Sequence, residues 1–420
     1  MATLINGLNF VQDWLSVKWR IVFSRLWYYE SNTDVFYYVN FISMISGIHY
    51  KSQTKWKQLA WKVYHNFAIT HFLIPFLSAV EIVIRHRDAI AVIWCGIVFF
   101  IGLAGCAHKH ILCGSYKTIL EVRKFIKSGT SSTSDPEFDC AKRRTFFRVT
   151  QTISLVVIFI IIMDELLSPA VVLHDDRYFN LPTFLCVSNL TANRLLRCVY
   201  LVIFIPIWVS KAYVALVETT ALVAGCRSEL TIFAKAFEEF LNDTIMNVET
   251  ESHDVFWESF KVNLRYQVKH HISHIENQCR VNKLLSEFFM VTYYRDVIVI
   301  GAMIFIIFLD GLSARSAVIV LSFYAFFAEC WWWSILSEFS ENINSSIEEH
   351  LIDLLIAIPY SRPYHSDYQQ TRTTLLIMKI ITSDCTSVKY AGVFDVNIQV
   401  FSQLVNISYS LLTFLLQVDI

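Results

Sequence analysis

The last hydrophobic segment of the chain carries polar side chains whose chemistry would suit the passage of hydrated ions. They are the amides and hydroxyls of Gln399, Gln403, Asn406, Ser410, Thr413 and Gln417. Steps of three or four residues place all six on one face of an α-helix, over roughly 27 Å, close to the thickness of a bilayer's hydrocarbon core. Polar groups at that depth are costly unless they meet water or one another. The stripe therefore predicts a pore lining or, alternatively, a polar seam between helices.

Other reactive side chains form weaker patterns. His270, His271 and His274 have a spacing that could bind a metal on a helix, but no carboxylate or cysteine completes the set. We expect these histidines on a solvated helix and predict no metal site and no cofactor. Arg295 and Asp296 are adjacent, so they do not face each other on a helix, and separate partners are expected for them.

The composition is that of an integral membrane protein. Hydrophobic residues make up 55% of the 420 residues and charged residues 17%, and the mean hydropathy is +0.46. A net charge of −1 gives no signature of nucleic-acid binding. The chain contains no nucleophile motif and no intramembrane His/Asp cluster, which argues against an enzyme. Among the scattered cysteines, Cys186 and Cys198 lie near a predicted outside loop, where a disulfide is one possibility.

Seven apolar stretches are long enough to cross a membrane, so the fold class is predicted to be an all-α, seven-transmembrane helix bundle. The stretches are 60–84, 89–112, 146–168, 196–224, 284–309, 314–338 and 391–418. The shorter stretch 33–49 is interpreted as a re-entrant or interfacial helix. Single charges inside the spans, such as Lys211, Glu218 and Glu329, are expected to face the interior of the bundle.

The positive charges predict the orientation of these spans. Lysine and arginine concentrate between spans two and three and between spans four and five, so both segments are expected to be cytoplasmic. The N-terminus is then cytoplasmic, without a cleavable signal peptide, and the C-terminus is extracellular. Residues 128–135 are predicted to form a flexible cytoplasmic loop, and Asn189 is a glycosylation sequon on the outer side. This orientation is opposite to that of G-protein-coupled receptors, whose DRY and NPxxY motifs are also missing, so no G protein is expected.

Several motifs in the second half of the chain resemble those of insect odorant receptors. They are Cys330-Trp-Trp-Trp-Ser-Ile-Leu-Ser-Glu-Phe-Ser-Glu341, Ala357-Ile-Pro-Tyr-Ser-Arg-Pro-Tyr364, Leu375-Leu-Ile-Met378, Ala391-Gly-Val-Phe394 and Ser408-Tyr-Ser-Leu-Leu-Thr-Phe-Leu415. The resemblance covers spans four to seven, and spans one to three by length and topology. The closing Gln417-Val418 is also compatible with the related insect gustatory receptors, which leaves a tastant-gated channel as the alternative function.

The resemblance implies a subunit of a ligand-gated, non-selective cation channel that opens on binding small volatile molecules. Such a tuning receptor assembles with an odorant receptor coreceptor in a heterotetramer whose seventh helices line one pore, in the plasma membrane of a sensory neuron dendrite. By position, Phe414, Gln417 and Val418 match the pore gate. The ligand is expected among spans two, three, four and six, with Tyr324 as hydrogen-bond donor. The aromatic and apolar residues expected there are Phe99, Phe100, Phe159, Met163, Phe204, Trp208, Phe323, Tyr324 and Phe327.

Five segments follow from these expectations. They are a cytoplasmic N-terminal region at 1–59, a ligand-binding bundle of spans one to four at 60–225, a cytoplasmic anchor at 226–283, spans five and six with a further anchor helix at 284–390, and the pore-lining span at 391–420.

Overall fold

The computed structural model is almost entirely helical. It describes residues 29–30, 33–48, 54–86, 89–174, 181–250, 252–311, 317–338, 341–384, 389–390, 394–395 and 398–418. The helices before the midpoint of the chain are α2 (Tyr37–Ile45), α3 (Lys55–Thr70), α4 (Leu73–His86), α5 (Ala89–Gly114), α6 (Tyr116–Ser128), α7 (Pro136–His174), the short 3₁₀ turn η1 (Thr183–Leu185) and α8 (Leu190–Thr250). The second half of the chain contains α9 (His253–Asp310), α10 (Ala317–Glu338), α11 (Glu341–Ala357), α12 (His365–Asp384), the strands β1 (Lys389–Tyr390) and β2 (Phe394–Asp395), and α13 (Ile398–Val418).

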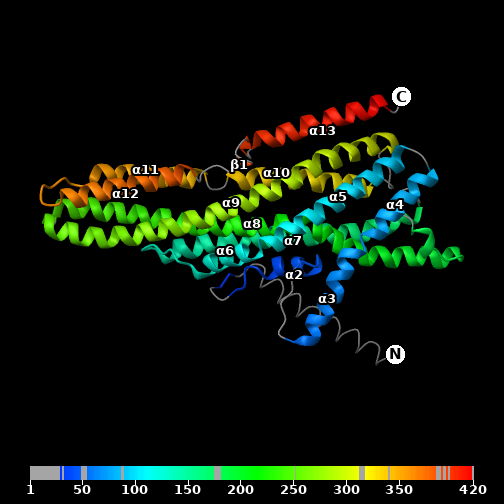
Figure 1. Cartoon of the computed structure of the whole chain (residues 1–420), viewed down its shortest axis with the longest axis horizontal. Helices are drawn as coiled ribbons and strands as arrows, with labels where there is room; N and C mark the ends of the chain where they lie inside the picture. Colours follow the sequence, from blue (N-terminus) through cyan, green and yellow to red (C-terminus); the bar gives the residue numbers. More distant parts are fainter. Residues whose placement is uncertain are drawn as a thin grey trace, which may run out of the picture.

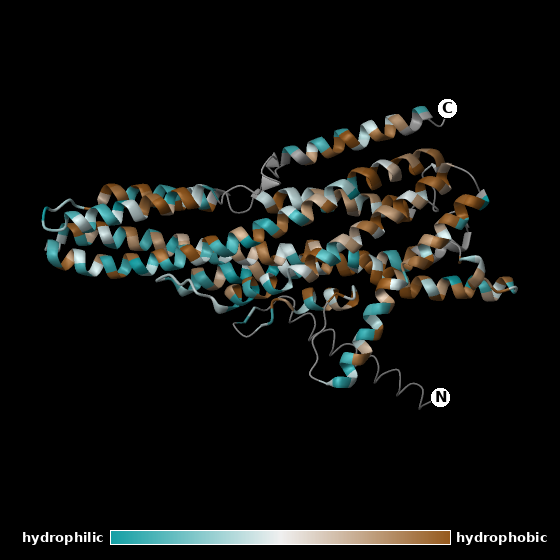
Figure 2. Ribbon diagram, in the orientation of Figure 1, coloured by the Kyte–Doolittle hydropathy of each residue, from teal (hydrophilic) through white to brown (hydrophobic). Residues whose placement is uncertain are grey.

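The helices α8 and α9 set the length of the molecule. They contain 61 and 58 residues, which at about 1.5 Å per residue is roughly 90 Å, three times the ~30 Å hydrocarbon core of a bilayer. Most of each helix must therefore lie outside the apolar layer. Figure 2 shows the division: hydrophobic colours concentrate in the half that holds α4, α5 and α10, and hydrophilic colours towards the end formed by α11, α12 and the adjoining parts of α8 and α9. We call these the apolar half and the charged half.

The apolar half is a bundle of helices that could span a membrane. Six helical segments in the described part of the chain are long and apolar enough to do so, and the chain is a multi-pass membrane protein. They correspond to the first six predicted spans, with α3 and α4 together forming the first. The seventh predicted span is α13, a helix of 21 residues that is not among the six, so the count of seven and the inside–outside orientation stay predictions.

The charged half has a hydrophobic core of its own. Phe237, Trp257, Leu351, Leu354 and Leu375 are fully buried there, and they come from α8, α9, α11 and α12. Four packed helices with an apolar centre explain how α8 and α9 continue so far beyond the membrane span. The expected anchor at 226–283 and the part of the segment 284–390 that forms α11 and α12 both contribute residues to this core.

The C-terminal helix α13 lies at the edge of the apolar half (Figure 1). It is preceded by the two-residue strands β1 and β2, which pair antiparallel with Lys389 opposite Asp395. Among the described elements it packs mainly on α9 and also on α10. Its C-terminal end points away from the end of the molecule that α11 and α12 form.

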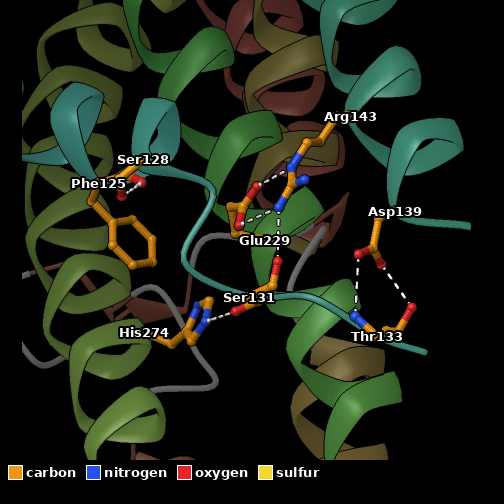
Figure 3. A network of polar contacts seen from close by, with 8 residues as sticks. All are labelled: Phe125, Ser128, Ser131, Thr133, Asp139, Arg143, Glu229 and His274. Atoms are coloured by element: carbon orange, nitrogen blue, oxygen red, sulfur yellow. Dashed lines mark hydrogen bonds and ion pairs between the residues drawn. The ribbon is translucent and has the colours of Figure 1, made fainter. Parts of the chain in front are cut away.

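The polar segment between α6 and α7 is held in place by hydrogen bonds (Figure 3). Ser131 shares a 2.7 Å hydrogen bond with Nε2 of His274 on α9. Ser134 donates to Glu239 on α8 from its hydroxyl at 2.8 Å and from its backbone amide at 2.9 Å. The loop predicted at 128–135 lies between α6 and α7, and the hydroxyls of Ser128, Ser131, Thr133 and Ser134 all form hydrogen bonds there. Its flexibility stays a prediction.

Ion pairing reinforces this segment. Arg143 on α7 donates from Nε to Glu229 on α8 at 2.8 Å and from Nη2 to the backbone carbonyl of Ser131 at 2.8 Å. Thr133 donates to Asp139 at 2.9 Å from its hydroxyl and at 3.1 Å from its amide. The segment therefore joins α7, α8 and α9.

Two of the three histidines expected on a solvated helix, His271 and His274, are buried, whereas His270 is half-buried. His271 and His274 are 1% and 3% exposed, and Nε2 of His271 pairs with the Thr382 hydroxyl on α12 at 2.8 Å. Both lie outside the apolar span 284–309. Burial lowers the pKa of His271 to about 4 and, with the charges of His270 and His271, that of His274 to about 3. Within the described residues no cluster of His, Cys, Asp or Glu could hold a metal ion.

Acidification is expected to destabilise the charged half. Unfolded histidine binds a proton near pH 6.5, whereas His271 and His274 in the folded chain do so only near pH 4 and 3. Stability is thus fully present above about pH 6.5 and is lost as the pH falls below it, by about 2 kcal/mol per histidine at about pH 5. The melting temperature of the purified protein in detergent, measured across this range, checks the prediction. Ser131→Ala/His274→Phe should show a shallower pH dependence; an equal slope would contradict it.

Candidate functional site

The polar stripe of α13 faces away from the rest of its own chain. The side chains of Gln399, Gln403, Asn406, Ser410, Thr413 and Gln417 are all exposed. The opposite face is buried, with Leu404 at 1% and Ser408 at 2% exposure. Ser408 is nine residues from both Gln399 and Gln417, and nine residues are two and a half turns at about 3.6 residues per turn. The buried face and the stripe are therefore on opposite sides of the helix.

A close approach of α13 to α9 fixes this rotation. A Cβ atom on Gly301 of α9 would meet the Leu411 side chain at 2.8 Å and the Ser408 carbonyl at 3.3 Å. The Ser408 hydroxyl also donates to the backbone carbonyl of Val297, at 3.4 Å. Because Gly301 has no side chain, the two backbones can approach closely, and the Ser408 hydroxyl has a hydrogen-bond acceptor within the contact.

The residues that match the gate lie at the C-terminal end of α13. Phe414 is 59% exposed, and Gln417 is exposed as well. Val418 is the last residue of the helix, and its side chain lies outside the described part of the structure. An aromatic ring and an amide thus project from the same end of the helix into space that this chain leaves open.

A cavity of about 190 Å³ lies inside the apolar half, between α5, α7, α8 and α10. These helices carry predicted spans two, three, four and six. Its volume is of the order of the ~150 Å³ apolar cavity that binds benzene in an engineered protein. The cavity is lined by Phe72, Trp94, Ile97, Val98, Ile101, Ile160, Asp164, Phe204, Ile205, Trp208, Val209, Ala212, Tyr213, Met303, Val318, Leu321, Ser322, Ala325 and Phe326.

Aromatic rings form two walls of the cavity. On one side Trp208 lies 4.6 Å from Phe72 and 5.4 Å from Phe204, between ring centroids. On the other side Tyr213 stacks on Phe326 at 6.0 Å. Such walls bind apolar molecules chiefly by removing them from water.

Two polar atoms in the lining are buried without a hydrogen-bond partner among the described residues. They are the indole Nε1 of Trp208, a donor, and Oδ1 of Asp164. A buried polar atom without a partner costs free energy, so a ligand that supplies a partner gains affinity and a preferred orientation. The arrangement suits a small, mainly apolar molecule with one or two polar atoms.

Of the residues predicted to bind ligand, Phe204 and Trp208 line this cavity and the others do not. Three of the others are exposed on the outside of the bundle, namely Phe99 at 41%, Phe159 at 59% and Tyr324 at 63%. The remaining four, Phe100, Met163, Phe323 and Phe327, are half-buried elsewhere. Phe327 contacts α13, with its ring 5.0 Å from that of Phe401.

Sequence reasoning missed Tyr213, Ser322 and Phe326, although a signal for two of them existed. Glu329 was expected to face the bundle interior, and Phe326 and Ser322 lie one and two turns before it on the same helix face. Tyr324 lies on another face of α10. The interior charge therefore indicated the orientation of the helix better than the aromatic side chains did.

A buried ion cluster lies directly beside the cavity. Arg295 of α9 donates from Nε to Asp296 at 2.6 Å and from Nη2 to Glu329 of α10 at 2.6 Å, and all three are 3% exposed or less. The expectation of separate partners for the adjacent Arg295 and Asp296 is wrong, because the long arginine side chain folds back to reach its neighbour. The guanidinium carbon also lies 4.8 Å from the ring centroid of Phe326, which is part of the cavity wall.

Removing the arginine of this cluster should be strongly destabilising. Arg295→Met leaves the carboxyl groups of Asp296 and Glu329 buried and unpaired, which is expected to cost about 3 to 5 kcal/mol. Arg280→Met is the matched control, since Arg280 is 41% exposed and forms a 3.6 Å surface pair with Glu121; it should change stability by less than about 1 kcal/mol. Thermal unfolding in detergent compares the two, and equal effects would mean that the buried cluster adds no stability.

The remaining predicted features are two cysteines and a glycosylation sequon. Cys186 and Cys198 are both free thiols, so the disulfide considered for them is not formed. Asn189 is exposed, and its side-chain oxygen accepts from the amides of Thr191 and Ala192 at the start of α8, at 3.0 and 3.2 Å. Its modification by a glycan stays a prediction.

Comparison with known proteins supports the fold. No protein-family model matches the chain, and no curated protein matches its sequence. Among solved structures, the chain is similar to the insect olfactory receptor OR5 from Machilis hrabei, with a TM-score of 0.69, 15% sequence identity, and coverage of 90% of this chain and 97% of that one. The same receptor in complex with eugenol gives a TM-score of 0.70 at the same identity and coverage. The chain therefore has the fold of an insect olfactory receptor.

Proposed function

We propose that the chain belongs to the insect odorant receptor family and is a tuning subunit of a non-selective cation channel opened by small volatile molecules. Volatile ligands bind in the cavity between α5, α7, α8 and α10, and α13 lines the pore. The partner is an odorant receptor coreceptor in a heterotetramer. The protein acts in the plasma membrane of sensory neuron dendrites, without a G protein and without enzymatic activity.

The exposure of the polar stripe on α13 is the observation that carries this proposal. Six amide and hydroxyl side chains face outward from the chain, opposite the buried contact with α9. Lipid would be an unfavourable neighbour for such a face, because hydrocarbon offers no hydrogen bonds. Among the described helices, the contact of α9 with α13 is on the opposite face, which favours a water-filled pore over a polar seam. Water enclosed by several copies of this helix satisfies the stripe.

The chemistry of the cavity supports a volatile ligand over a tastant. A soluble tastant needs a pocket rich in polar groups, whereas this lining is mostly aliphatic and aromatic, with Asp164, Ser322, Trp208 and Tyr213 as its polar members. The structural similarity extends to a receptor in complex with eugenol. Both points favour an odorant receptor over a gustatory receptor.

The connection between α8 and α9 supports a tuning subunit rather than the coreceptor. Only residues 251 and 252 separate the two helices, whereas the coreceptor is expected to carry a long insertion between spans four and five. In this arrangement the N-terminus is cytoplasmic and the C-terminus extracellular. Phe414, Gln417 and Val418 of each subunit then form the gate near the outer face, where apolar rings close the pore by excluding water.

Whole-cell current from cells that express the chain with and without an insect coreceptor tests this function directly. Cation current evoked by volatiles only when the coreceptor is present is the expected result. Current from the chain alone would contradict the tuning role and favour a self-sufficient channel. No current in either case, with both proteins at the cell surface, would contradict the channel proposal.

Filling the cavity should weaken the response to ligand. Ala325→Phe adds a ring to the cavity lining and is expected to raise the half-maximal odorant concentration at least about tenfold, because the ligand loses its apolar contacts. Tyr324→Ala is the control on the same helix, since this exposed side chain is outside the cavity. Concentration–response curves measure both variants, and a larger effect of Tyr324→Ala would place the ligand elsewhere.

Removing the last amide side chain of the stripe, at the gate, should change ion permeation without changing ligand preference. Gln417→Ala removes an amide dipole that would solvate cations, so the relative permeability of Na⁺, K⁺ and Ca²⁺ should shift while the rank order of odorants stays the same. Tyr409→Phe is the control, because Tyr409 is exposed on α13 but lies off the stripe. Reversal potentials in ion-substitution experiments distinguish the variants. Equal shifts in both would argue against a pore lined by the stripe.

A further inference from the structure

A groove with a volume of about 680 Å³ lies beside α6, away from both the odorant cavity and the pore helix. Its walls come from α2 and the residues after it, from the end of α5, from α6, and from Glu218 of α8. The lining is amphipathic. It contains the cations Arg123, Lys124 and Lys127 together with apolar side chains that include Phe41 and Leu120, which are 40% and 44% exposed.

The polar and apolar parts of the groove are separated along its length. Lys127 pairs with Asp34 at 2.8 Å, and Arg123 donates to Asn40 at 2.7 Å, so the beginning of α2 lies beside the later turns of α6. The two helices are antiparallel here. The other end of the groove is therefore formed by the end of α2 and the residues after it, and by the end of α5 and the beginning of α6. Those residues are Met44, Ile48, Leu112, Tyr116 and Ile119, which are mostly apolar.

The apolar end of the groove lies towards the membrane, and its basic end lies towards the predicted cytoplasmic side. The apolar end contains Leu112, in the last turns of the membrane-spanning helix α5, which ends at Gly114. The basic end lies on α6, in the segment whose positive charges predict a cytoplasmic location. The groove thus runs from the depth of acyl chains to the depth of headgroups on the cytoplasmic side.

Two of the three cations are available to a ligand. Arg123 is engaged by both carboxylate oxygens of Glu218 and by Asn40. Lys124 is exposed, and the Lys127 side chain is 53% exposed and pairs, among the described residues, with Asp34, whose side chain is 47% exposed. A surface pair of this kind contributes little and is readily exchanged. The charge of Glu218 offsets that of Arg123 and the charge of Asp34 offsets that of Lys127, so Lys124 leaves the headgroup end of the groove with a net positive charge.

We infer that this groove binds an anionic phospholipid of the cytoplasmic leaflet. Lys124 and Lys127 contact the phosphate and the acidic headgroup, and one acyl chain lies along Phe41, Leu120 and Met44. Basic pockets beside membrane helices on the cytoplasmic side recognise anionic headgroups in this way. The site is independent of the proposed channel function, because neither the odorant cavity nor α13 contributes to it.

Competition between lipids on the wild-type protein is the first test. The purified full-length chain in a nonionic detergent is titrated with dioleoyl phosphatidylserine and with dioleoyl phosphatidylcholine, and bound lipid is counted by native mass spectrometry. We expect one tightly retained phosphatidylserine, and weaker, unsaturable association of phosphatidylcholine. Equal retention of both lipids overturns the inference. Glycerophosphoserine, which lacks acyl chains, should compete poorly; competition as strong as that of the diacyl lipid would indicate an anion site and not a lipid site.

Charge removal locates the site in the groove. Lys124→Gln/Lys127→Gln should weaken phosphatidylserine binding about 30-fold, at about fivefold for each lysine near the headgroups. The matched control is Lys117→Gln/Lys269→Gln, which removes the same charge from exposed positions of α6 and α9 outside the groove. This control should leave binding within about twofold. An equal loss in both variants would show that phosphatidylserine follows net charge alone and would overturn the assignment.

Discussion

Charged and polar groups inside a bilayer must find partners within the protein, and the packing of the apolar half follows from this requirement. Arg295 pairs through Nε with Asp296 on its own helix and through Nη2 with Glu329 on α10, which fixes the register between α9 and α10. Lys211 of α8 is satisfied by the backbone carbonyl of Ala68 on α3. Each pairing offsets the free energy of burying a charge. The interior charges therefore decide which faces of α8, α9 and α10 point inward.

The same requirement applies to α13, whose six polar side chains are exposed and lie opposite its buried contact with α9. The cavity and this helix are also linked through short contacts. Phe326 lines the cavity and lies 4.8 Å from the guanidinium carbon of Arg295. Two residues further along α9, the carbonyl of Val297 accepts the Ser408 hydroxyl of α13. A ligand that displaces Phe326 would therefore act on the segment of α9 that contacts α13.

The cavity shows how far helix faces can be inferred from sequence. Phe204 and Trp208, two of the residues predicted to bind ligand, line the cavity, and they lie seven and three residues before the interior Lys211, on the same face of α8. Tyr324 and Phe159 were chosen for their aromatic character and are exposed instead. Aromatic side chains suit lipid as well as ligand, so their type does not reveal which way they point, whereas a charge in a span nearly always points inward.

The sequence by itself determined the membrane class, the first six spanning helices and the polar stripe, because hydropathy and helical periodicity are local properties of a segment. It also carried motifs that resemble the receptors whose fold the chain adopts. Only the tertiary structure decided which aromatic rings enclose the cavity, that Ser131 and His274 are joined across the charged half, and that the stripe faces outward. Those outcomes depend on how each helix is rotated against its neighbours. That rotation is set by contacts between residues far apart in the chain, such as Gly301 with Leu411 and Arg295 with Glu329.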